Sequence, residues 1–294
     1  GFVWTEREEE ADLIGAIACS VRQRAIDRVD ARIDRWNAWK ETRPLLTFVS
    51  GCVLPHDEER LEGKFDFVVR TADVPSLPDL IRQDGLVTPA SGGGFLGTDD
   101  AFWKIAPRYS SDYAAFVPIQ NGCDKLCTFC AVPYTRGREV SRPSADILHE
   151  VGRLVGLGYN SITLLGQNVN SYGIDRPGEQ SFAELLDGVA ELCESSGRTI
   201  WVYYTSPHPQ DMSADVLETM ASRPALAKQV HLPLQSGDDK ILIRMNRNYR
   251  LDRYRKIVEE IRSIIPTATL STDIIVGFTG ETDEQFEKTR LAMK

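Results

Sequence analysis

The chain has 294 residues, of which 42% are hydrophobic and 26% charged, and its formal net charge is −9. A chain of this length can bury a sizeable core and is expected to hold two domains. Because the net charge is negative, the protein as a whole does not attract nucleic acid, so any contact with RNA needs a local patch of positive charge. No apolar run reaches the roughly 18–20 residues of a membrane span, so we expect no membrane partner.

Six cysteines are too few for a disulfide scaffold in a chain this long, and three of them cluster. Clustered cysteines indicate metal ligands in a reducing compartment, so we expect a cytoplasmic protein. No signal peptide is evident. The sequence starts at Gly1 without a methionine and stops inside a predicted helix, so we expect a fragment of a longer protein.

Residues 1–90 predict a small parallel α/β domain. Apolar runs at 11–19, 45–52 and 65–71 are typical of buried strands. Apolar residues at helical spacing fill the segment between the first two runs, and a short helix is expected at 76–83. Strands that alternate with helices in this way indicate a parallel sheet.

Cys19 and Cys52 fall at the C-terminal ends of the first two predicted strands. Ligands bind at that edge of an open parallel sheet. A cysteine is often simply a small buried hydrophobe, but two at equivalent strand ends favour a shared metal site. The Gly-rich stretch 91–100 then predicts a linker over 91–110.

Residues 111–294 predict a second domain in which strands and helices alternate regularly. Strands are expected at 114–120, 161–168, 199–206, 229–236 and 269–278. Helices are expected at about 144–158, 181–197, 211–223, 238–246, 251–264 and 282–294. Five β/α units in sequence indicate a partial (β/α) TIM-like barrel, whose chemistry lies at the C-terminal ends of the strands.

Cys123, Cys127 and Cys130 form a C-x3-C-x2-C pattern just after the first of these strands. Thiolates select zinc, copper or iron–sulfur clusters, and a structural zinc ion wants four ligands. The next candidate ligand is His149, on a predicted helix. A cubane cluster on three thiolates leaves one iron open, which favours catalysis. Chance, a zinc knuckle with a distant fourth ligand, and redox thiols remain alternatives.

Polar residues follow the other barrel strands and are expected to meet at the same mouth. The candidate cofactor-binding residues are Gln167, Asn168, Ser206, Gln235, Gly277 and Glu281. Each alone could be a turn residue or a helix cap, but their convergence favours a binding site. His208 and His231 could act as general bases, although a lone histidine near a strand is more often structural.

The cysteine segment also carries a local excess of positive charge on this acidic chain. Between Asn121 and Pro143 the cations are Lys125, Arg136, Arg138 and Arg142, against Asp124 and Glu139. Arg136, Arg138 and Arg142 are therefore candidates for contact with RNA phosphate. A solvated loop of mixed charge is the alternative.

The string CDKLCTFCAVPYTRGREVSRP, from residue 123 to 143, resembles the radical S-adenosylmethionine (SAM) tRNA methylthiotransferases, in particular the 2-methylthio-N6-isopentenyladenosine branch. The segments ADLIGAIACSVRQRA, VSGCVLPHDEERL, LLGQNVNSYG, TSPHP, LPLQSG, MNRNY and STDIIVGFTGET resemble the same family in the same order. The chain departs from the family pattern at Ile17 and Ala18, where a polar pair is usual, and at Thr279, where proline is usual.

The resemblance implies a [4Fe–4S] cluster on Cys123, Cys127 and Cys130, with SAM at the open iron. It implies a 5′-deoxyadenosyl radical that abstracts hydrogen from C2 of N6-isopentenyladenosine at position 37 of tRNA, and a second SAM that supplies the methyl group. Sulfur would come from an auxiliary [4Fe–4S] cluster bound by three cysteines. Two of these match Cys19 and Cys52, and the third would lie upstream of Gly1.

The implied partners are the tRNA anticodon loop and an electron donor such as flavodoxin or ferredoxin, and a monomer is expected. One alternative is a sister methylthiotransferase that acts on threonylcarbamoyladenosine or on an aspartate of a ribosomal protein. Another is a zinc-binding, non-catalytic RNA-interaction module.

Overall fold

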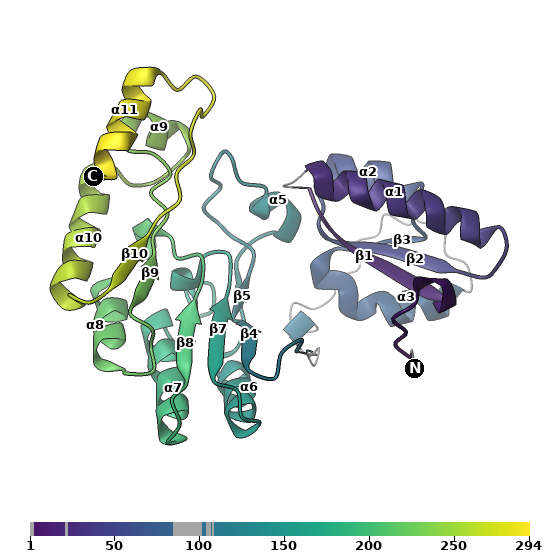
Figure 1. Cartoon of the computed structure of the whole chain (residues 1–294), viewed down its shortest axis with the longest axis horizontal. Helices are drawn as coiled ribbons and strands as arrows, with labels where there is room; N and C mark the ends of the chain where they lie inside the picture. The colour runs from purple at the N-terminus through teal and green to yellow at the C-terminus, as the bar shows by residue number, and fades with distance from the viewer. Residues whose placement is uncertain (1–2, 21–22, 85–101, 104–106, 108) are drawn as a thin grey trace. The chain divides into compact units, whose positions relative to one another are not determined.

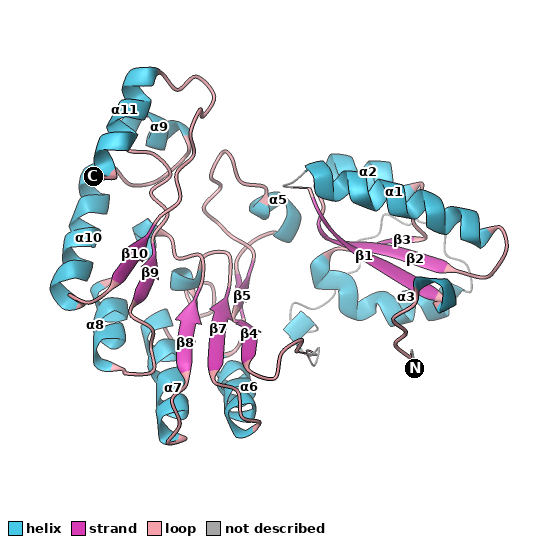
Figure 2. Cartoon of the chain, viewed as in Figure 1, coloured by secondary structure: helices cyan, strands magenta, loops and turns pink. Residues whose placement is uncertain are grey.

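The computed structural model describes residues 3–20, 23–84, 102–103, 107 and 109–294. Most of the predicted linker lies outside these residues. The chain divides into two compact units, residues 1–106 with 131–137, and residues 107–130 with 138–294 (Figure 1). Both units combine helices with parallel strands (Figure 2), as the sequence predicts.

The first unit is a three-stranded parallel sheet in the order β1-β2-β3. Its strands are β1 (Leu13–Cys19), β2 (Leu46–Cys52) and β3 (Phe67–Val68), and its helices are α1 (Gln23–Lys40), α2 (Pro55–Glu62) and α3 (Leu77–Asp84). Short 3-10 turns lie at Glu8–Glu10 and Thr71–Ser76. The third strand is shorter than expected, and α2 was not among the predicted helices.

Helices cover both faces of this sheet, with α1 and α2 on one side and α3 on the other (Figure 1). The inward stripe of α1, including Ile33 and Trp36, packs against Ile14 and Val49. On the opposite face Phe48 packs beside Phe67 and Leu77. Residues 48 and 49 belong to different cores because neighbouring side chains of a strand point to opposite faces.

The second unit begins with three parallel strands in the order β4-β7-β8: β4 (Ala114–Pro118), β7 (Ser161–Leu165) and β8 (Trp201–Tyr204). A further parallel pair joins β9 (Gln229–His231) to β10 (Thr269–Ser271). Leu226, just before β9, forms a parallel bridge with Val202 of β8. The five strands therefore follow one another in chain order, as in the predicted partial barrel (Figure 1).

The long helices of this unit are α6 (Ser144–Gly156), α7 (Phe182–Ser195), α8 (Ala214–Ser222), α10 (Leu251–Ile264) and α11 (Asp283–Ala292). Shorter helical pieces are α5 (Val132–Arg136), which groups with the first unit, α9 (Asp239–Arg244), and 3-10 turns at Val169–Ser171 and Pro209–Asp211. Capping boxes fix the starts of α7 and α11. No helix in the described ranges is long and apolar enough to cross a bilayer.

The predicted helices of the barrel are confirmed, but the last two strands are shorter than predicted. The ladder between β9 and β10 stops just before Pro233, whose ring nitrogen cannot donate a hydrogen bond. Pairing resumes irregularly beyond it, where the Gln235 N–H donates to the Asp273 carbonyl at 2.9 Å. The segments expected as strand ends are thus loops at the C-terminal edge.

Candidate active site

A short antiparallel ribbon ties together the two ends of the cysteine loop, residues 122–139. It consists of β5 (Gln120–Asn121) and β6 (Val140–Ser141). The sequence predicted a single strand to residue 120, whereas the structure ends β4 at Pro118 and turns the next residues into this ribbon. The Gly122 N–H then donates to Gln167 Oε1 at 2.7 Å, which links the start of the loop to the end of β7.

The loop folds back on itself between Cys123 and Cys130. The Cys130 N–H donates to the Cys127 carbonyl at 2.9 Å, and Leu126 has a φ of 49°, which is uncommon for a bulky side chain. Cys127 is buried and the other two cysteines are half-buried. Burial raises the pKa of the Cys123 thiol to about 11, so metal binding there must displace a proton.

Residues 244–247 wrap around the cysteine loop. Asn246 Nδ2 donates to the carbonyls of Lys125 at 3.3 Å and Leu126 at 3.0 Å. Thr128 adds two hydrogen bonds, from its N–H to the Met245 carbonyl at 3.2 Å and from its hydroxyl to the Arg244 carbonyl at 2.9 Å. The left-handed turn at Leu126 is therefore held by a segment more than a hundred positions away in the chain.

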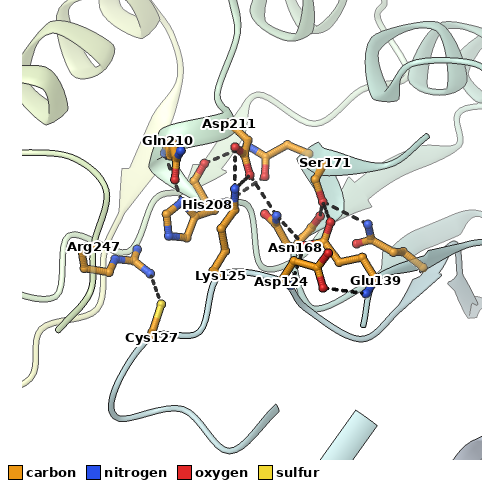
Figure 3. A network of polar contacts seen from close by, with 12 residues as sticks. Asp124, Lys125, Cys127, Glu139, Asn168, Ser171, His208, Gln210, Asp211 and Arg247 are labelled. Carbon is orange, nitrogen blue, oxygen red and sulfur yellow. Dashed lines mark hydrogen bonds and ion pairs between the residues drawn. The ribbon is translucent and has the colours of Figure 1, made fainter. Parts of the chain in front are cut away.

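Arg247 is the residue of this segment that reaches a cysteine (Figure 3). Its Nη1 lies 3.4 Å from Cys127 Sγ, its Nε donates to the Tyr249 hydroxyl at 3.0 Å, and its Nη2 donates to the Pro233 carbonyl at 3.0 Å. The side chain is buried, with 6% of its surface exposed. The string MNRNY resembles the family in sequence, but no local pattern in it predicts a role for Arg247.

A polar network joins the cysteine loop to the ends of β7 and β8 (Figure 3). Lys125 Nζ lies 2.7 Å from Asp211 Oδ2. Asn168 Nδ2 donates both to that carboxylate, at 2.9 Å, and to Glu139 Oε1, at 3.0 Å. Asn168, a predicted cofactor-binding residue, is thus buried at the mouth, whereas Asp211 and Glu139 were not among the predicted site residues.

Glu139 also connects the end of the cysteine loop to its beginning. Its backbone N–H donates to Asp124 Oδ1 at 3.2 Å, and its Oε1 accepts the Asp124 N–H at the same distance. The Ser171 hydroxyl donates to Glu139 Oε2 at 2.7 Å. Glu139 therefore joins the end of the loop to its beginning at Asp124 and to the 3-10 turn that follows β7.

His208 is a buried neutral imidazole in this network. Its Nδ1 accepts the Gln210 N–H at 3.2 Å, which places the ring proton on Nε2. Burial, together with the nearby charges of Arg247 and Lys125, lowers the pKa of His208 to about 2. In the described part of the chain Nε2 has no hydrogen-bond partner. A neutral imidazole with its proton on Nε2 suits a hydrogen-bond donor better than the general base that its place near a strand end suggested.

His231 is held differently, on the exposed side of β9. Its Nδ1 lies 2.9 Å from Ser271 Oγ and its Nε2 lies 3.1 Å from Asp273 Oδ2. Both ring nitrogens are therefore engaged by neighbouring strand residues, which favours the structural interpretation.

The remaining predicted cofactor-binding residues lie in the later strand-end loops. Ser206 and Gln235 both have positive φ, at 58° and 70°, and such strained conformations cluster at functional sites. Glu281 Oε2 accepts the Gly277 N–H at 2.6 Å. The side chain of Arg244 donates to the carbonyls of residues 279 and 280, while its own carbonyl holds Thr128. The fifth strand end is thereby connected to the cysteine loop.

The three predicted RNA-contacting arginines have different surroundings. Arg138 is exposed and lies 3.0 Å from Asp124, and Arg136 Nε lies 3.2 Å from Cys52 Sγ within the first unit. The prediction for Arg142 does not fit its surroundings, because the side chain is only 8% exposed and is bonded to the buried Glu150. Its guanidinium is committed to the core of the barrel, so phosphate contact by Arg142 is not supported.

Cys19 and Cys52 lie at the same level of the first sheet, as their predicted strand ends require. They are paired residues in the parallel register of β1 and β2. Gly51 permits this approach, since it has a φ of 115° and an added Cβ would lie 2.2 Å from the Ala18 carbonyl oxygen. Cys193, the sixth cysteine, lies on α7 and is fully buried in the core of the second unit.

The chemistry of the donor set fits a cubane cluster, because three thiol-bearing residues lie on one loop. Among the described residues, no three His, Cys, Asp or Glu side chains converge on one point where an ion could be held. A structural zinc ion needs four such ligands, whereas a cubane takes each thiolate on a different iron. Three cysteines on one curled loop, with the Arg247 cation beside the Cys127 sulfur, suit such a cluster.

The model of the radical SAM superfamily matches residues 117–292, and the chain belongs to that superfamily. Its cofactors are accordingly a [4Fe–4S] cluster and SAM. Two solved structures share the fold, each at 13% identity and a TM-score of 0.69. One is the cobalamin-dependent radical enzyme OxsB, and the match covers 97% of this chain and 44% of that one. The other is the methyltransferase TsrM from Kitasatospora setae, and the match covers 96% of this chain and 60% of that one.

Three curated relatives of this chain carry the same enzyme name. The chain is 38% identical to the tRNA-2-methylthio-N(6)-dimethylallyladenosine synthase of Chlorobium phaeobacteroides, over 100% of this chain and 65% of that protein. It is 41% identical to the synthase of Carboxydothermus hydrogenoformans, over 98% and 66%, and 40% identical to that of Streptomyces avermitilis, over 97% and 56%. The chain thus spans about two thirds of these relatives or less.

Proposed function

We propose that the protein is a radical SAM methylthiotransferase that adds a methylthio group to C2 of N6-isopentenyladenosine at position 37 of tRNA. The observation that carries this proposal is the 38–41% identity to synthases named for that product, over nearly the whole chain. The curled three-cysteine loop at the mouth of the barrel supplies the site that such chemistry needs.

Cys123, Cys127 and Cys130 are the proposed ligands of the radical-generating cluster. When bound, the cluster supplies the electron that cleaves SAM to a 5′-deoxyadenosyl radical. The chain's own groups hold the loop closed through Asn246 and Glu139 and present polar atoms at the strand ends. The proposed SAM-binding residues are Gln167, Asn168, Ser206, Gln235, Gly277 and Glu281.

Cys19 and Cys52 are proposed as partial ligands of the auxiliary cluster, and Arg136 and Arg138 as contacts to the phosphates of the anticodon loop. Paired strand ends support the first assignment, and the exposure of Arg138 supports the second. We further propose a cytoplasmic monomer that receives electrons from a flavodoxin or ferredoxin, because tRNA and reduced thiols share that compartment.

The decisive experiment replaces Cys123, Cys127 and Cys130 together with alanine. After anaerobic reconstitution, the variant should lack the iron and sulfide of the wild-type protein and should form no 5′-deoxyadenosine from SAM and dithionite. Cys193→Ala is the matched control, since that thiol lies in the core, and it should keep both properties. Continued 5′-deoxyadenosine formation by the triple variant contradicts the assignment. Parallel assays with isopentenyladenosine and threonylcarbamoyladenosine tRNA then test the substrate.

A further inference from the structure

We propose that Arg247 is a positioning residue that sets the reduction potential of the cluster through its hydrogen bond to the Cys127 sulfur. The inference rests on the proposed ligand set and deepens it. Hydrogen bonds to cluster sulfurs and the charge around a cluster are the main means by which a protein tunes iron–sulfur potentials. Arg247 provides both, from a loop outside the cysteine segment.

The guanidinium is fixed in one orientation. All three of its nitrogens are engaged, one each by the Tyr249 hydroxyl, the Pro233 carbonyl and the Cys127 sulfur. Its carbon also lies 5.1 Å from the centre of the Tyr249 ring, and Tyr249 is itself buried with hydrogen bonds to the carbonyls of residues 233 and 234. The N–H that faces Cys127 is therefore pre-organised and does not depend on a mobile side chain.

Arg247 also lacks a carboxylate partner. Its three nitrogens contact a hydroxyl, a sulfur and a carbonyl, and among the described residues no ion pair joins it to an Asp or Glu, although its side chain is buried. A buried charge without a counter-ion is costly. Three thiolates around a cubane form a negatively charged group, so the cluster itself is the counter-ion that this arginine fits.

The charged and titratable groups beside Arg247 in the described residues do not offset its positive charge. Lys125 is neutralised by Asp211 at 2.7 Å. The ring of His208 packs edge-on to Tyr249 at 5.8 Å and is neutral. Arg247 is therefore a cation in direct contact with the Cys127 sulfur, and Lys125 and His208 beside it add no uncompensated charge.

One-electron reduction adds a negative charge to the cluster and moves no proton. A buried cation in contact with a ligand sulfur stabilises that extra charge more than it stabilises the oxidised form. Arg247 should therefore raise the potential, so that dithionite or a biological donor can supply the electron. Without Arg247 the reduced state becomes harder to reach.

The test compares Arg247→Gln, Arg247→Lys and Arg250→Gln in the reconstituted chain. Arg250 lies in the same loop but donates to the carbonyls of residues 247 and 249 and not to sulfur, so it is the matched control. Midpoint potentials are measured by redox titration followed by EPR, with the signal assigned by its change on SAM addition. Arg247→Gln should lower the equilibrium constant for reduction at least tenfold, about 59 mV for a one-electron couple.

Arg247→Lys keeps the positive charge but lacks the planar guanidinium. Its midpoint potential should therefore lie between those of the wild type and Arg247→Gln. Arg250→Gln should match the wild type. An unchanged midpoint in Arg247→Gln, at wild-type iron content, overturns the proposal. If Arg247→Gln loses its iron, the lysine variant decides, and a wild-type midpoint there also overturns it. If the three cysteines did not bind the cluster at all, the wild-type protein itself would lack iron, so this outcome is distinguishable from a failure of the Arg247 proposal.

Discussion

Cys19 and Cys52 are partners in the parallel register of β1 and β2, each as the last residue of its strand. In a parallel ladder, paired residues point to the same face of the sheet, so the two thiols lie near each other at the edge where ligands bind. The printed sequence has no other cysteine before Cys123.

Two thiolates hold a cubane poorly, so we predict that this chain binds about four irons after anaerobic reconstitution rather than about eight. The double variant Cys19→Ala/Cys52→Ala should keep this content and should still cleave SAM reductively, because that step needs only the barrel loop. Iron and sulfide analysis measures both proteins. About eight irons per chain in the parent protein would show that Cys19 and Cys52 recruit further ligands.

Gly51 should be intolerant of a side chain. Its positive φ and the 2.2 Å approach of an added Cβ to the Ala18 oxygen predict that Gly51→Ala destabilises the first unit by more than about 1 kcal/mol. Gly63→Ala is the control, because Gly63 has a φ of −81° and nothing lies within 4 Å of its would-be Cβ. Urea unfolding measures both, and equal stabilities would refute the close approach of the strands.

Variants of Arg136, Arg138 and Arg142 should distinguish a role in RNA binding from a role in folding. The double variant Arg136→Ala/Arg138→Ala should flatten the log–log salt dependence of tRNA binding by about two units, one for each lost phosphate contact. Arg142→Ala should leave that slope unchanged but cost about 3–5 kcal/mol of stability, since it strands the buried Glu150 carboxylate. A slope that changes only in Arg142→Ala would reverse this assignment.

His208 should make stability depend on pH. Its pKa is about 2 in the folded chain and about 6.5 when unfolded, so the unfolded state binds the proton more readily. The stability from the neutral ring is present above pH 6.5 and is lost as pH falls below it, by about 1 kcal/mol at pH 5.5. His208→Gln should remove this component. Urea titrations at pH 7.5 and 5.5 compare the two proteins, and identical pH dependence would show that His208 is solvated.

The sequence predicted the parts of the site that local patterns encode. The spacing of Cys123, Cys127 and Cys130 required a curled loop, and polar residues at strand ends placed Asn168 at the mouth, as found. Hydrophobic periodicity likewise identified the helices of the barrel, because burial repeats every turn.

Long-range contacts were not predictable in the same way. Arg247 and Asn246 follow a six-residue helix and carry no local signal of the cysteine loop, which lies about 120 positions earlier. Arg142 was expected outside because arginine is usually exposed, and only the tertiary partner Glu150 accounts for its burial. Pairing between distant side chains depends on the completed fold, which a single sequence does not display.

The β5–β6 ribbon has a consequence for repair of the site. Because Gln120 pairs with Ser141 and Asn121 with Val140 through backbone hydrogen bonds, the ends of the loop stay together whether or not metal is bound. The entropy of closing the loop is thus lost when the barrel folds, not when iron enters. We therefore expect that a molecule that has lost its iron to oxygen rebuilds the site by moving its three thiols, without having to close the loop again.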